Sequence, residues 1–185
     1  SNMKLSPIAL LVFVMSSALF AQAPPIGPGV SQELARWRAA RYSDVRYKLN
    51  LTLEKMSPVL KGTIEIRVRV SGGDGEKRSG GVKAETRPVG SVPPIILDWR
   101  KIKGHEEKSI ISNVTINGTS LDIYGPEAYH LDVIFRPSVI ADQEHLIFRN
   151  GVRLGENVIK LDFTSPILPS GSAITRYVDK EDGSE

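Results

Sequence analysis

Residues 45–54 read VRYKLNLTLE, and this stretch decides the class of fold. Apolar and polar side chains alternate along it without a break, which is typical of a β-strand with one buried face and one solvated face. The apolar positions are Val45, Tyr47, Leu49, Leu51 and Leu53. The same alternation returns in TIEIRVRV at residues 63–70, after a connection that contains Pro58 and Gly62. Two amphipathic strands so close in sequence are expected to pair as an antiparallel hairpin.

Strand patterns resume in the second half of the chain. The candidates are IILDWRKI (95–102), SNVTINGTSLD (112–122), YHLDVIFR (129–136), HLIFRNG (145–151) and GENVIKLDFTSPI (155–167). Within the second of these, Asn117-Gly118 separates two short apolar runs, which is the strongest short-range signal for a hairpin. We therefore predict an all-β fold, mainly antiparallel, built as a sandwich or as curved, saddle-like sheets.

The remaining segments suggest how the chain is organised. Residues 24–40 are expected to form a Pro/Gly-rich linker and then a short helix that Ser31 caps, and residues 41–185 a single β domain. Residues 71–94 are rich in Gly, Pro and charge and are expected to form a long flexible loop. A domain boundary is the alternative for this stretch, but the strand pattern resumes immediately after it, which favours the loop.

The N-terminus has the layout of a secretory signal peptide. Ser1-Asn2 are typical of the remnant of an expression tag, and Met3-Lys4 begin a short basic region. An apolar run from Ile8 to Phe20 ends at the small-x-small cleavage signal Ala21-Gln22-Ala23. The run is shorter than the roughly 20 residues that a membrane span needs. Residues 1–23 are therefore expected to be removed, leaving an exported protein, periplasmic or extracellular, without a stable membrane span. An uncleaved anchor is the alternative.

Composition excludes several classes of protein. The 24 basic and 21 acidic residues nearly balance, and the basic ones are scattered along the chain. Nucleic-acid binding usually needs a basic stripe or cluster, so we expect no nucleic-acid partner. The chain has no cysteine, so it has no disulfide, no thiolate metal ligand and no thiol nucleophile. Its stability must come from its core.

A search for catalytic motifs nominates no catalytic, cofactor-binding or metal-binding residue. His105 lies in GHEEKS, which lacks the second histidine that a zinc helix needs, so a solvated turn is expected. His130 and His145 lie in or beside strand candidates and are expected to be ordinary surface or edge histidines. No Gly-x-Ser-x-Gly elbow and no phosphate-binding loop occur. Asn50, Asn113 and Asn117 begin Asn-x-Ser/Thr sequons, which mark surface positions if the host attaches glycans.

The chain resembles, over residues 41–185, the N-terminal β domain of zinc aminopeptidases of the aminopeptidase N type. The similar segments follow the order of that family. They are RYSDVRYKLNLTLEKMSPVLKGTIEIRV (41–68), PPIILDW (93–99), ISNVTINGTSLD (111–122), GENVIKLDF (155–163) and the tail that ends in RYVDKEDGSE (176–185). The loop at 71–94 is longer than the family needs.

The resemblance implies the non-catalytic part of an exported enzyme that removes N-terminal residues from peptides. The family's Gly-x-Met-Glu-Asn and His-Glu-x-x-His motifs are absent from this sequence, so zinc is expected in a missing catalytic domain that follows Glu185. The β domain would pack against that domain, wall off part of the substrate cleft and help anchor the amino end of a peptide substrate. We expect no activity and no bound cofactor from this chain alone.

Two other functions remain open from sequence. One is a free-standing secreted β-sandwich that binds a glycan or a protein, which exposed aromatic side chains would favour. The two tryptophans do not support it, since Trp37 lies on the apolar side of the predicted helix and Trp99 among apolar strand neighbours. The other is a subunit-interface domain.

Overall fold

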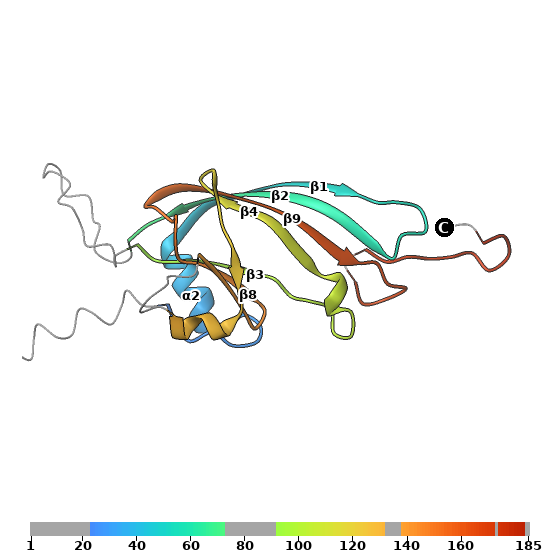
Figure 1. The fold of residues 1–185 in the computed structure, drawn as a ribbon, viewed down its shortest axis with the longest axis horizontal. Helices are drawn as coiled ribbons and strands as arrows, with labels where there is room; N and C mark the ends of the chain where they lie inside the picture. The colour runs from blue at the N-terminus through green and yellow to red at the C-terminus, as the bar shows by residue number, and fades with distance from the viewer. Residues whose placement is uncertain (1–22, 73–91, 132–137, 173, 184–185) are drawn as a thin grey trace, which may run out of the picture.

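The structure is a computed structural model that describes residues 23–72, 92–131, 138–172 and 174–183, and it confirms the all-β fold (Figure 1). A larger sheet has five strands in the order β1-β2-β9-β4-β5, and a smaller sheet has four in the order β3-β8-β7-β6. The larger sheet contains β1 (Tyr42–Thr52), β2 (Val59–Val70), β4 (Ile110–Ile116), β5 (Thr119–Ser120) and β9 (Gly155–Pro166). The smaller sheet contains β3 (Ile95–Asp98), β6 (Ile123–Tyr124), β7 (Val139–Asp142) and β8 (His145–Phe148). The helical elements are α2 (Gln32–Arg41) and the 3₁₀ helices η2 (Glu106–Lys108) and η3 (Pro126–Leu131).

All pairs among the described strands are antiparallel except β6 with β7, which is parallel. The central pair is β2 with β9, which runs unbroken from Val59 opposite Pro166 to Val70 opposite Gly155. The register of β1 shifts near Asp44 and that of β4 shifts near Asn113, and both residues have a φ of 51°. Bulges of this kind bend a strand and increase its twist. The larger sheet is accordingly curved, with the smaller sheet and α2 on its concave side (Figure 1).

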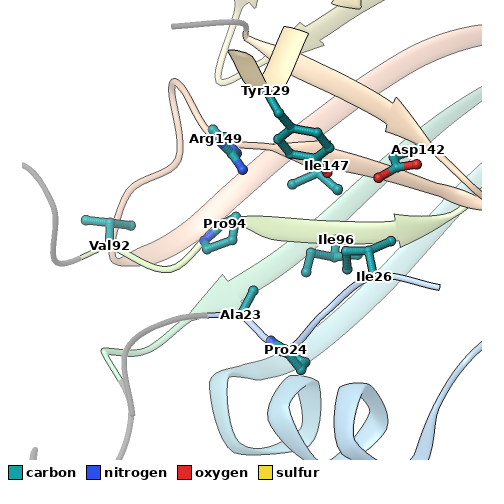
Figure 2. A pocket seen from close by; sticks show the side chains of 10 residues that line it. All are labelled: Ala23, Pro24, Ile26, Val92, Pro94, Ile96, Tyr129, Asp142, Ile147 and Arg149. Atoms are coloured by element: carbon teal, nitrogen blue, oxygen red, sulfur yellow. The ribbon is translucent and has the colours of Figure 1, made fainter. Parts of the chain in front are cut away.

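The predicted short helix is confirmed as α2, and it covers the outer face of the smaller sheet. Its first turn is capped by Ser31, whose hydroxyl accepts a hydrogen bond from the backbone N–H of Leu34 at 3.1 Å. A helix this short is marginal in water, so packing must hold it. A second apolar cluster supplies that packing, and its buried members are Leu34, Trp37, Ile96, Ile140 and Ile147. Ala23 and Ile26 from the segment before the helix pack beside it (Figure 2).

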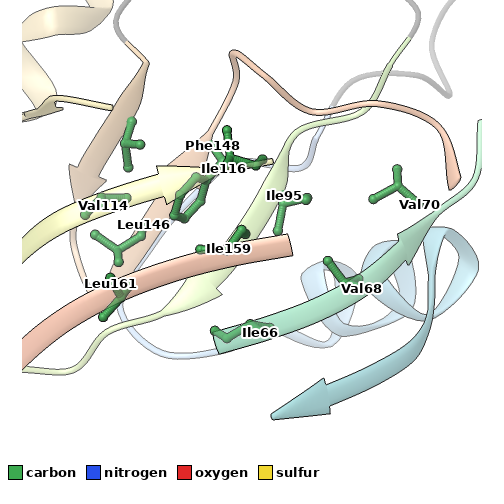
Figure 3. Packing of buried hydrophobic residues seen from close by; sticks show 11 residues of the cluster. Ile66, Val68, Val70, Ile95, Val114, Ile116, Leu146, Phe148, Ile159 and Leu161 are labelled. Carbon is green, nitrogen blue, oxygen red and sulfur yellow. The ribbon is translucent and has the colours of Figure 1, made fainter. Parts of the chain in front are cut away.

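The main core lies between the two sheets (Figure 3). Its buried members are Ile66, Val68, Val70, Ile95, Val114, Ile116, Val139, Leu146, Phe148, Ile159 and Leu161. Burying one such side chain stabilises the fold by about 1.5–3 kcal/mol. Phe148 and Ile159 have no exposed surface, so the two sheets are in close contact at this point. The result is three layers: larger sheet, smaller sheet, and α2 with the N-terminal segment.

Several expectations need correction. The strand predicted at 95–102 ends at Asp98, and the one predicted at 129–136 is wrong for Tyr129–Leu131, which belong to η3. Residues 1–22 and 73–91, which contain the predicted signal peptide and most of the predicted loop, lie outside the described residues, as do 132–137. Within the described ranges, none of the helices is both long enough and apolar enough to cross a membrane. The largest correction concerns the apolar face of β1, because that face is not buried.

Candidate functional site

The most unusual feature of the surface is an exposed row of apolar side chains on β1. We call this row the β1 stripe: Val45, Tyr47, Leu49, Leu51 and Leu53, the last of which directly follows the strand end at Thr52. Their exposed fractions run from 43% for Leu51 to 66% for Tyr47, although the alternation predicted a buried face. Monomeric proteins rarely expose contiguous apolar patches of this kind unless the patch binds something. The β1 stripe is therefore the candidate functional site.

Strand pairing places the stripe on the core side of the larger sheet. Tyr47 lies opposite Ile66 and Leu49 opposite Ile64, so their side chains share the face that carries the main core. The smaller sheet covers that face over β2, β4 and β9 only at one end, and its edge strand β3 has four residues against the eleven of β1. The long strands β1, β2 and β9 run well beyond the smaller sheet (Figure 1). The stripe is exposed because the covering layer is too short and too narrow.

The apolar surface continues from β1 across Gly62 to Phe163. These positions face each other in the sheet, since Leu51 pairs with Gly62 and Gly62 with Phe163. A Cβ added at Gly62 would lie 2.5 Å from the Phe163 ring and 3.0 Å from Leu51 Cδ2. The missing side chain therefore lets the ring lie across β2. Phe163 also meets Trp99 edge-on, with ring centroids 6.1 Å apart.

A groove of about 300 Å³ lies where the first two residues of the stripe approach the smaller sheet and α2. One wall carries Val45 and Tyr47 of the stripe, and the other carries Leu97 of β3. Arg38 and Asp98 also line the groove and form a two-pronged ion pair, with N–O distances of 2.7 and 3.0 Å. The groove therefore presents apolar walls beside one paired charge.

His145 is fully buried beside this ion pair, so the expectation of a surface or edge histidine was wrong. Its Nδ1 lies 3.0 Å from Asp98 Oδ1, and its Nε2 lies 3.1 Å from the carbonyl oxygen of Gly27 and 2.9 Å from that of Gly29. Carbonyl oxygens only accept hydrogen bonds, so Nε2 carries a proton and donates it. Because Nε2 is occupied by backbone, His145 fastens the N-terminal segment to the smaller sheet and is not a catalytic base.

The charges around Asp98 shift its titration. Burial alone would raise the pKa of Asp98, but the hydrogen bonds and charges of Arg38 and His145 outweigh it, and the pKa lies below its ordinary value. The carboxylate therefore stays ionised and holds Arg38 and His145 together. No local pattern in the sequence links these three positions, because each lies in a different element and the contact exists only in the fold.

A second cavity, of about 580 Å³, lies on the outer side of the smaller sheet (Figure 2). Ile96 and Ile147 form apolar parts of its wall, and the guanidinium of Arg149 lies 5.0 Å from the centre of the Tyr129 ring. Two other wall residues, Ala23 and Val92, adjoin stretches that lie outside the described residues. We assign no ligand to this cavity.

The other residues singled out from sequence are placed as follows. His105 directly precedes η2 in a turn, as expected. His130 belongs to η3 rather than to a strand. Trp37 is 8% exposed and Trp99 is partly buried, so both pack as predicted. Over the ranges that the structure describes, no group of three or more His, Asp or Glu side chains could hold a metal ion.

The three sequons differ in how their side-chain amides are used. Asn50 Nδ2 donates to Thr63 Oγ1 at 3.2 Å, and Asn113 Nδ2 donates to Asp162 Oδ2 at 2.7 Å, both on exposed surface. Asn117 Nδ2 donates both hydrogens, at 2.9 Å to the Gly151 carbonyl and at 3.0 Å to a side-chain oxygen. An attached glycan replaces one of the two amide hydrogens. Because Asn117 donates both of its hydrogens, only there would glycosylation remove one of the hydrogen bonds described above.

Comparison of the sequence with models of known protein families and with curated proteins finds no match. The fold and the β1 stripe nonetheless define a class: a two-sheet, all-β domain whose larger sheet leaves part of its apolar concave face uncovered.

Proposed function

We propose that this chain is the amino-terminal, non-catalytic domain of an exported zinc aminopeptidase, which removes N-terminal residues from peptides. The β1 stripe is the observation that carries the proposal, because it is an apolar surface that lacks a covering layer within the described chain. The ordered series of segments that resembles the aminopeptidase N family supports the choice of catalytic domain as the covering partner.

The energetics of the stripe favour a packed partner. Fully burying a leucine side chain contributes about 1.5–3 kcal/mol. Leu49, Leu51 and Leu53 are each about half exposed, so much of that contribution is unrealised in the chain alone. The opposite face of the same strand carries Arg46 and Lys48, which are suited to water. A catalytic domain on the concave face would complete the core, and the β domain would form one wall of the substrate cleft.

In this proposal the zinc belongs to the catalytic domain. We therefore assign no chemical step to this domain. Its role is to provide a rigid support, and the unbroken β2–β9 ladder between the stripe and the core supplies that rigidity.

The proposal is tested in the parent enzyme. We expect the reading frame after Glu185 to encode the zinc motif, and the double substitution Leu49→Asp with Leu51→Asp to lower kcat/KM on an aminoacyl reporter by about tenfold or more at unchanged zinc content. Asn50→Asp is the control, since this side chain is also exposed but lies on the opposite face of β1. A gene that stops at Glu185, or equal activities for all variants, would refute the proposal.

The isolated chain gives a second test. We expect the purified chain to cleave no aminoacyl reporter and to retain no stoichiometric zinc. Turnover that scales with chain concentration and is abolished by a chelator would show that the chain itself is an enzyme.

A free-standing binding module is the second candidate, and the exposure of Tyr47 favours it. Aromatic side chains that protrude from a sheet are suited to stack on sugar rings, and Tyr47 is 66% exposed. A glycan array with clear hits that Tyr47→Ala abolishes would favour this function over the first. No binding on the array would leave the packing role of the stripe as the better account.

A further inference from the structure

We infer that this chain forms a twofold dimer in which β1 of one copy pairs edge to edge with β1 of the other. β1 is an outer strand of the larger sheet, and among the described strands its only hydrogen-bonded neighbour is β2. Beyond the bulge at Asp44, its free edge is regular from Arg46 to Thr52. An exposed edge of this length is a template for strand pairing.

The side chains of β1 are complementary to themselves in one antiparallel register. With the twofold axis at Asn50, Leu49 lies opposite Leu51 of the partner subunit. Pairing that continues two residues past the end of β1 at Thr52 places Tyr47 opposite Leu53 of the partner subunit. On the other face, Arg46 lies opposite Glu54 of the partner subunit. Symmetry repeats each pairing, so the interface gains four apolar pairs and two ion pairs across the edge.

The charges select this register over its neighbours. An axis at Leu49 would place Asp44 opposite Glu54 of the partner subunit, and an axis at Lys48 would place that lysine opposite its own copy. Both arrangements oppose like charges. An axis at Leu51 would place Tyr47 opposite Lys55 of the partner subunit instead of opposite a leucine. The axis at Asn50 gives the four central stripe residues apolar partners and Arg46 an acidic one, and leaves only Val45 opposite Lys55 of the partner subunit.

The charged residues are free to make these contacts at little cost. Arg46 now pairs with Asp44 at 2.7 Å, and Glu54 pairs with Lys61 at 3.0 Å, with all four side chains largely exposed. Exposed ion pairs contribute little, so they yield readily to a shared network. Pairing about an axis perpendicular to the sheet also leaves the concave face open, so the dimer does not compete with the domain packing proposed above.

Sedimentation velocity of the purified chain over a range of concentrations tests the inference. The chain has a mass of 20.3 kDa, and we expect a second species of twice that mass whose share grows with concentration. Arg46→Glu and Glu54→Arg should each raise the dimer dissociation constant by about tenfold or more, and the two together should restore it to within about threefold. Lys101→Glu, an exposed position outside both sheets, should leave it unchanged.

Hydrogen exchange shows whether β1 is the site of contact. We expect residues 46–52 to be protected at high concentration and to lose that protection on dilution. A chain that stays monomeric, a dimer that ignores both charge reversals, or a dimer in which 46–52 stays unprotected overturns the inference. Each of these results leaves the proposed packing on a catalytic domain to its own test in the parent enzyme.

Discussion

The phenol of Tyr42 joins the helix–strand boundary to the smaller sheet. Its hydroxyl donates to the Pro94 carbonyl at 2.7 Å and accepts from the Ile96 N–H at 3.0 Å. Burial raises the pKa of Tyr42 well above its ordinary value, although the Ile96 hydrogen bond and the charges of Arg38 and Arg41 oppose the rise. The phenol is therefore neutral at pH 7 and able to make both bonds.

We predict that Tyr42→Phe lowers the free energy of unfolding by about 1–3 kcal/mol, because it leaves two backbone groups without a partner. Urea denaturation of the two proteins measures the difference. Tyr47→Phe is the control, since the Tyr47 side chain is exposed and its hydroxyl is free to bond with water. Equal effects of the two substitutions would contradict this account of Tyr42.

The ionised Asp98 should make stability depend on pH. Its pKa is lower in the folded than in the unfolded chain, so its contribution is fully present above the unfolded value of about 4 and is lost as the pH falls through the folded value. Asp98→Asn should therefore cost about 1 kcal/mol at pH 7, a modest value because half of the side chain is exposed.

The measurement for Asp98 is the unfolding free energy at several pH values between 7 and about 2. The difference in unfolding free energy between the native protein and the Asp98→Asn variant should decrease as the pH falls. Asp122→Asn, at an exposed position before β6, is the control. A difference that stays constant with pH would show that the carboxylate charge contributes nothing.

At the scale of elements, the packing across β2 depends on Gly62, whose missing side chain leaves room for the Phe163 ring. Gly62→Ala places a Cβ against the Phe163 ring, which must then shift and so change its edge-on contact with Trp99. We predict a loss of about 1–3 kcal/mol in unfolding free energy, as for other overpacked sites, together with a change in the near-ultraviolet circular dichroism of Trp99. Gly27→Ala is the control, because nothing lies within 4 Å of its added Cβ. An unchanged spectrum for Gly62→Ala would contradict the contact.

The sequence alone predicted the positions of the strands better than it predicted which of their faces are buried. The alternation at 45–54, 63–70 and 155–167 identified β1, β2 and β9, because a period of two is a property of the strand itself. The same pattern could not show that β1 would stay exposed, since burial depends on the width of a second sheet. The strand predicted at 129–136 failed at Tyr129–Leu131, where Gly125-Pro126 begin a 3₁₀ turn instead.

The contacts that His145 makes could not be predicted from the sequence either. His145 bonds to Asp98 and to the carbonyls of Gly27 and Gly29. The two glycines lie more than a hundred residues before His145 in the sequence. Each of these residues looks ordinary in its own segment. Only the stacking of α2 and the N-terminal segment on the smaller sheet brings them together.

At the scale of the whole molecule, three layers bury two apolar clusters and leave one apolar surface open. Within the ranges that the structure describes, the smaller sheet is covered on both faces, whereas the larger sheet is covered at one end only. The β1 stripe lies on the uncovered part of the larger sheet. The two proposals concern what binds there: a catalytic domain that packs on the concave face, and a second copy of the chain that pairs with the edge of β1.

The most direct test of the central claim is the reactivity of a thiol placed on the stripe. The chain has no cysteine, so Leu49→Cys and Asn50→Cys each introduce a single thiol into it, on opposite faces of β1. Maleimide labelling at each position, read by peptide mass spectrometry, is compared between the dilute chain and the parent enzyme. We predict labelling at position 49 to be slower in the parent by about tenfold or more, with position 50 unchanged. Equal labelling at position 49 in both proteins would contradict the claim that a catalytic domain covers this face.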